Sequence, residues 1–169
     1  MRVELINPFI SAADSVFNTM LNCRLKRQTL AVNTDHSPMH EVSGLIGMSG
    51  NFRGMVVVSL AQETALRAAG ILLGSQPEEL DYEVMDAIGE LTNMIAGAAK
   101  TQLERYELSI GLPTIIFGKQ QKIMFPSGSA PIVIPFTSAI GPVCVQVGLV
   151  ELRRTPEPAA LVCGTGANI

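Results

Sequence analysis

The chain has 169 residues, of which 47% are apolar and 16% are charged, and its net charge is −3. This length suits one domain or one domain with an internal duplication, and the apolar content argues against a disordered chain. With only 5% aromatic residues and a slight excess of acid, the chain lacks the basic field and the stacking surface of a nucleic-acid-binding protein.

The first predicted helix starts at Asn7-Pro8, with Asn7 as the N-cap and Pro8 at the first helical position. Apolar residues follow at three- and four-residue steps as far as Asn22, which is typical of an amphipathic helix. Residues 25–33 alternate in part and predict a strand, and a turn is expected at residues 35–38.

The middle of the chain predicts a hairpin and a helix. Strands are expected at residues 42–48 and 55–60, because the Ser49–Asn51 segment between them has the composition of a tight turn. Residues 62–73 then predict a short helix that ends at Gly74.

A second long helix is expected from its N-cap at Asp81 to about Arg105. Pro113 opens an extended region, and strands are predicted at residues 115–117, 132–136 and 143–152. This order of elements predicts an α+β fold in which long helices pack on one face of an antiparallel or mixed sheet.

Residues 1–153 are expected to form a single domain, and residues 154–169 a mobile C-terminal tail. The three cysteines are odd in number and far apart, which argues for a reducing compartment. Glu4 and Pro8 interrupt the N-terminus before any apolar leader forms, and no apolar run is long enough to cross a bilayer. We therefore expect a cytoplasmic protein without a membrane segment.

The second long helix carries the strongest functional signal. At about 100° per residue, one narrow stripe of this helix contains Asp86, Glu90, Asn93, Gly97 and Lys100. The opposite side of the helix is apolar. The sequence therefore predicts a buried face and an exposed Asp-x-x-x-Glu-x-x-Asn stripe.

Small residues, Gly89, Ala96 and Gly97, surround this stripe. A glycine inside a helix costs roughly 1 kcal/mol relative to alanine, so these glycines indicate that another backbone comes close. A carboxylate and a carboxamide one turn apart can enter a partner's pocket together, and the amide can both donate to and accept from a water. An ordinary solvated helix face is the alternative interpretation.

The segment from Asp86 to Asn93 resembles the signature helix of the CheC/CheX/FliY phosphatases of bacterial chemotaxis. Their pattern is Asp or Ser, three residues, Glu, two residues, Asn, and then Pro about two dozen residues later. Pro113 is the candidate here, and its distance from Asn93 along the chain is a little shorter than the pattern has. The Asn-Pro-Phe start at Asn7 and the single intact motif resemble CheX more than CheC, and the resemblance covers most of residues 1–153.

A degenerate copy of the motif lies in the first predicted helix. Three polar residues there have the same mutual spacing as Asp86, Glu90 and Asn93, and they are Ser11, Ser15 and Asn18. The offset between the two sets also separates Pro38 from Pro113. Because Ser15 replaces the acid, we expect the first helix to be inactive. The repeat predicts the pseudo-twofold arrangement of CheC- and CheX-like proteins, with chance similarity as the alternative.

The resemblance implies a protein aspartyl-phosphate phosphatase that acts on a phosphorylated CheY-type response regulator. In that role Asn93 would orient the attacking water and Glu90 would pair with the regulator's active-site lysine, so both are expected catalytic residues. The expected partner-binding residues are Asp86, Gly89, Met94 and Gly97. The phosphate, its aspartate and Mg²⁺ would belong to the regulator, so no metal or cofactor is expected on this chain.

The resemblance also implies a homodimer whose sheets join, which the mean hydropathy of +0.32 allows. Two other functions fit the same helix. A binding module would hold a regulator or a flagellar or signalling partner without hydrolysis. A purely structural dimer would bury the stripe between its subunits, leaving Glu90 and Asn93 inaccessible. A zinc site at His36 and His40 is not expected, because Pro38 separates them.

Overall fold

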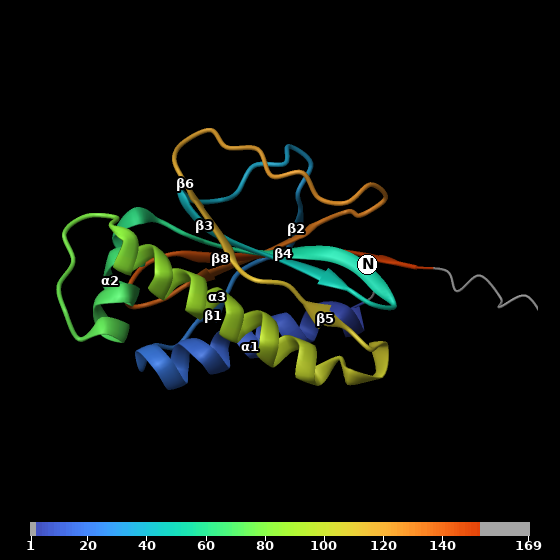
Figure 1. The fold of residues 1–169 in the computed structure, drawn as a ribbon, viewed down its shortest axis with the longest axis horizontal. Coiled ribbons are helices and arrows are strands. Elements are labelled where there is room, and N and C mark those ends of the chain that lie inside the picture. The colour runs from blue at the N-terminus through green and yellow to red at the C-terminus, as the bar shows by residue number, and fades with distance from the viewer. Residues whose placement is uncertain (1–2, 153–169) are drawn as a thin grey trace, which may run out of the picture.

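The computed structural model describes residues 3–152, in which three helices pack on one face of an eight-stranded antiparallel sheet (Figure 1). The predicted α+β class is therefore confirmed. The helical elements are α1 (Val3–Leu21), α2 (Gln62–Leu73), α3 (Tyr82–Gln102) and the 3₁₀ helix η1 (Glu104–Tyr106). The strands are β1 (Lys26–Arg27), β2 (Ala31–Val32), β3 (Val42–Ser49), β4 (Phe52–Leu60), β5 (Ser109–Ile110), β6 (Thr114–Phe117), β7 (Ile132–Thr137) and β8 (Val143–Glu151).

The order of strands across the sheet is symmetric. β7, β8, β4 and β3 form its centre, β1 and β2 both pair with β7, and β5 and β6 both pair with β3. A pseudo-twofold axis between β4 and β8 therefore relates α1 and β1–β4 to α3 and β5–β8. This is the arrangement that the repeated motif predicts, and the edge strands of each half pair with the other half.

The first helix starts earlier than the sequence predicts. α1 already includes Val3, so Pro8 lies inside the helix and Asn7 is not its N-cap. A proline there cannot donate the backbone hydrogen bond of a helix interior. Leu5 and Phe9 on either side of this point are buried in the core. Packing of the first turns offsets the missing hydrogen bond, and no local sequence signal reports that packing.

The boundaries of the other helices agree better with the sequence. Gly74 ends α2 at a φ of 65°, a left-handed conformation that glycine adopts without strain. Asp81 caps α3, because its carboxylate accepts a hydrogen bond of 2.9 Å from the backbone N–H of Val84. α3 ends at Gln102 rather than near Arg105.

The sequence predicts the central strands well and the edge strands poorly. β6, β7 and β8 begin and end within one residue of the predicted bounds, whereas β4 starts at Phe52, three residues earlier than predicted. Residues 25–33 hold two short strands instead of one, and no sequence pattern predicts β5. Two-residue strands at a sheet edge have too few residues to show an alternating pattern.

The two faces of the sheet are covered differently. The helices cover one face, where α1, α3 and alternate residues of β4 and β8 form the main core. The loops at residues 33–41 and 118–131 lie on the other face (Figure 1). There Val57, Ile123 and Phe125 form a smaller apolar cluster. The side chain of Asn33 donates a 3.0 Å hydrogen bond to the buried Gln146, which ties the first loop to β8.

No helix within residues 3–152 combines the length and the apolar character needed to span a membrane. Cys23 and Cys144 are buried free thiols, and burial raises the pKa of Cys144 to about 12. Cys163 and the predicted tail, residues 154–169, lie outside the described residues.

We expect Asp81→Ala to lower the free energy of unfolding by about 1 kcal/mol, because it removes the side-chain cap of α3. Asp81→Asn keeps an oxygen that can accept the bond from Val84 and serves as the matched control. Chemical denaturation followed by circular dichroism measures both. Equal losses in the two variants would contradict the capping role.

Candidate functional site

The predicted polar stripe lies on the solvent side of α3. Ile88, Leu91 and Ile95 on the opposite side are fully buried in the main core. Asp86 and Glu90 are exposed and Asn93 is partly exposed. Within residues 3–152, the structure records no hydrogen bond or ion pair for these three side chains. Their polar groups are therefore available to another molecule.

A close contact with β3 fixes the rotation of α3. Thr92 is buried, and its hydroxyl donates a 2.7 Å hydrogen bond to the carbonyl of Ile88. Its side chain lies directly on Gly44 of β3, where a Cβ atom would collide with the threonine. Because this side of α3 touches the sheet, the turn that carries Glu90 and Asn93 faces away from it.

The glycines of α3 face the chain's own edge strands. A Cβ placed on Gly89 would lie 3.7 Å from Ile115 and 3.8 Å from Pro113, and one on Gly97 would lie 4.0 Å from Ile110. The groups that come close to these glycines are therefore side chains of the chain's own edge segment, residues 110–115. Gly89 is buried within this chain, and its place in a partner-binding surface stays a prediction. Gly97 is partly exposed.

Pro113, whose role the motif spacing left open, belongs to this neighbourhood. It lies against Gly89, one turn before Asn93, while Ile110 lies against Gly97, one turn after Asn93. The segment between them, Gly111–Leu112, therefore passes the turn of α3 that carries Asn93. No sequence pattern singles out this segment, because neither residue carries a reactive group.

Met94, another predicted partner contact, is half-buried and packs against the main core. Beyond Asn93 the stripe continues into an open hollow of about 510 Å³. Its lining includes Gly97, Lys100 and Ile110. Asp86, Glu90, Asn93 and this hollow form one continuous stretch of α3 surface, which we call the α3 surface.

The degenerate copy on α1 lacks the chemistry of the α3 motif. The hydroxyl of Ser11 donates to the carbonyl of Pro8 at 3.1 Å and to the side-chain oxygen of Gln102 at 2.8 Å. Ser15 is exposed and Asn18 is partly exposed. Because the position equivalent to Glu90 holds a serine, α1 offers no carboxylate there.

The sheet register corrects the predicted equivalence of Pro38 and Pro113. In the first half of the molecule, Arg27 and Ala31 pair with β7. The residues that take the same places in the second half are Ile110 and Thr114, which pair with β3. Both comparisons give the same offset, 110 − 27 = 114 − 31 = 83, so position 113 corresponds to position 30. Pro38 lies after β2, on the loops of the other face. The connection after α3 is longer than the one after α1, so one sequence offset cannot hold for both elements.

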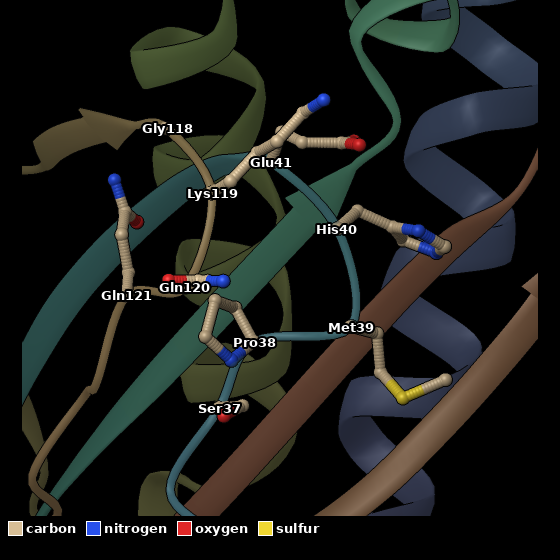
Figure 2. Close-up of a pocket in the computed structure, with 9 residues that line it drawn as sticks. All are labelled: Ser37, Pro38, Met39, His40, Glu41, Gly118, Lys119, Gln120 and Gln121. Carbon is tan, nitrogen blue, oxygen red and sulfur yellow. The ribbon is translucent and has the colours of Figure 1, made fainter.

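A second hollow, of about 180 Å³, lies between the two loops at residues 37–41 and 118–121 (Figure 2). His40 lines it, and burial lowers the pKa of this histidine. No cluster of three or more His, Cys, Asp or Glu side chains within residues 3–152 is arranged to hold a metal ion. The predicted catalytic side chains lie on α3 and none of them lines this hollow.

Known proteins are similar to this chain in fold and in sequence. A family model described as chemotaxis phosphatase CheX matches residues 42–137. The CheY-P phosphatase CheX of Thermotoga maritima is 28% identical over 126 residues, which cover 73% of this chain and 81% of that protein. A CheC-like superfamily protein from a Shewanella species (PV-4) has a TM-score of 0.82 and 34% identity, covering 89% of this chain and 100% of that chain.

A chain of the CheX–CheY–BeF₃–Mg²⁺ complex from Borrelia burgdorferi has a TM-score of 0.74 and 26% identity, covering 89% of this chain and 100% of that chain. The family match spans more than half of the chain and includes the whole Asp-x-x-x-Glu-x-x-Asn stripe. This chain belongs to the CheX family of chemotaxis phosphatases.

Proposed function

We propose that this chain removes the phosphoryl group from the aspartyl phosphate of a CheY-type response regulator. The observation that carries the proposal is the exposed pair of Glu90 and Asn93 on α3, for which the described residues supply no internal partner. The activity named for the Thermotoga relative and the CheY partner named for the Borrelia complex support it.

The α3 surface can supply what this hydrolysis needs from a second protein. A water oxygen attacks the phosphorus, the bond to the aspartyl oxygen breaks, and the products are aspartate and inorganic phosphate. Positioning of the water opposite the leaving oxygen provides much of the rate enhancement in phosphoryl transfer. The carboxamide of Asn93 has a donor and an acceptor with which to hold that water.

Glu90 would dock the helix by pairing with the lysine of the regulator's active site. The carboxylate lies one turn before Asn93 on the same side of α3, so both groups can enter one cleft. Asp86, one turn further, and Gly97 would lie at the borders of the contact, with Met94 at its edge. The phosphate and Mg²⁺ belong to the regulator in this proposal.

Asn93→Ala should slow regulator dephosphorylation by about 100-fold or more, because the water loses its positioning group while the fold persists. Release of inorganic phosphate from the phosphorylated regulator measures this. Asn18→Ala, the matched change in the degenerate copy on α1, should leave the rate unchanged. Retained activity in Asn93→Ala would refute the assignment. A wild-type chain that binds the regulator without speeding hydrolysis would be a binding module.

Glu90→Ala should weaken binding as well as turnover, since it removes the carboxylate that would pair with the regulator's lysine. The affinity for the regulator activated with BeF₃⁻ and Mg²⁺, measured by calorimetry, should fall by about tenfold or more. Ser15→Ala at the equivalent position of α1 is the control. An unchanged affinity in Glu90→Ala would remove the docking role and leave Glu90 with a purely chemical one.

We further propose that the chain is a homodimer whose sheets join. β6 forms an edge of the sheet, and Phe117 at its end is 60% exposed. Exposed edge strands with apolar residues pair readily with another strand. Sedimentation equilibrium should give twice the chain mass of 18.0 kDa. A single species of 18.0 kDa at all concentrations would contradict the dimer.

A further inference from the structure

The edge strand beside α3 contains one extra residue. Ile110 of β5 pairs with Met48 of β3, and Thr114 of β6 pairs with Leu45. The edge strand therefore takes 114 − 110 = 4 steps where β3 takes 48 − 45 = 3. This is a β-bulge at residues 111–113, and such bulges redirect side chains next to functional sites.

The bulge decides which way the neighbouring side chains point. Ile110 and Ile115 both face α3, against Gly97 and Gly89, although they are five positions apart. In a regular strand, residues an odd number apart point to opposite faces. The extra residue shifts the alternation by one position, so that Ile115 again faces α3. The residue in the middle of the bulge then packs neither against the helices nor against the sheet.

That residue is Leu112, which is 90% exposed, the highest value among the large apolar side chains of residues 3–152. Its backbone is nevertheless held on both sides. The N–H of Gly111 donates a 2.9 Å hydrogen bond to the carbonyl of Gly47, and Pro113 lies against Gly89 of α3. Leu112 is thus an exposed apolar side chain, on a backbone segment held from both neighbours, beside the turn of α3 that carries Asn93.

The pseudo-symmetric half of the molecule provides an internal comparison. Its edge strand has the same extra residue, because β1 and β2 take 31 − 27 = 4 steps along β7, which takes 136 − 133 = 3. With the offset between the two edges, the residue equivalent to Leu112 is Thr29. Both halves therefore have the bulge. In the half without the motif glutamate the bulge carries a polar residue, and in the half with Glu90 and Asn93 it carries a leucine.

We infer that Leu112 is the apolar anchor of the surface on which the regulator docks, an inference that rests on the proposed function. A partner that places a cleft over Glu90 and Asn93 must also cover the adjacent bulge. A large apolar side chain that stands on a held backbone next to a polar site can contribute strongly to binding when a partner covers it. The partner is the same regulator, which would cover Leu112 when its phosphorylated cleft lies over Glu90 and Asn93.

The experiment compares Leu112→Thr, which copies the residue of the other half, with Leu30→Thr as the matched control. Leu30 is 39% exposed and lies at the equivalent bulge between β1 and β2. The substrate is a CheY-type regulator that the wild-type chain dephosphorylates. Phosphate release gives KM and kcat, and calorimetry gives the affinity for the same regulator held active by BeF₃⁻ and Mg²⁺.

Leu112→Thr should raise KM and Kd by about tenfold or more and leave kcat unchanged, because it removes a docking contact and no group that touches the phosphate. Leu30→Thr should match the wild type. A KM for Leu112→Thr equal to that of the wild type, or a loss confined to kcat, would overturn the anchor role while the proposed function stands. A wild-type chain that dephosphorylates no CheY-type regulator would instead refute the proposed function itself.

Discussion

The contact between Thr92 of α3 and Gly44 of β3 determines how the functional helix is presented. Because Gly44 has no side chain, the helix packs directly on the strand, and Thr92 fills the space where a Cβ would lie. The apolar residues on the neighbouring side of α3 then enter the main core. Because two sides of α3 pack against β3 and the main core, Glu90 and Asn93 lie on the remaining side, which faces solvent.

The edge strands β5 and β6 form the rest of the candidate site beside α3. β5 and β6 pair with β3, and their apolar side chains pack on Gly89 and Gly97 of α3. The helix and the edge strand therefore hold each other in place on both sides of Asn93. The turn of α3 between these two contacts has little freedom to tilt. Catalysis by positioning of Asn93 depends on that rigidity.

The pseudo-twofold symmetry separates what the fold needs from what the function needs. Both halves have a long helix, a bulged edge strand and two central strands. Only α3 carries Glu90, whereas α1 has Ser15 at that position. Features shared by the halves, such as the bulge, serve the architecture, and features present in one half are the candidates for recognition and chemistry.

The sequence by itself determined the element order, the α3 cap at Asp81 and the outward stripe of Asp86, Glu90 and Asn93, because these follow from local periodicity and capping. The start predicted for α1 at Asn7-Pro8 is wrong, because burial of the neighbouring turns lets the helix continue through Pro8. Only the tertiary structure decided that Gly89 faces Pro113, and that Leu112 stands on a bulge beside Asn93. Those facts depend on pairing between segments far apart in the chain, which no local pattern encodes.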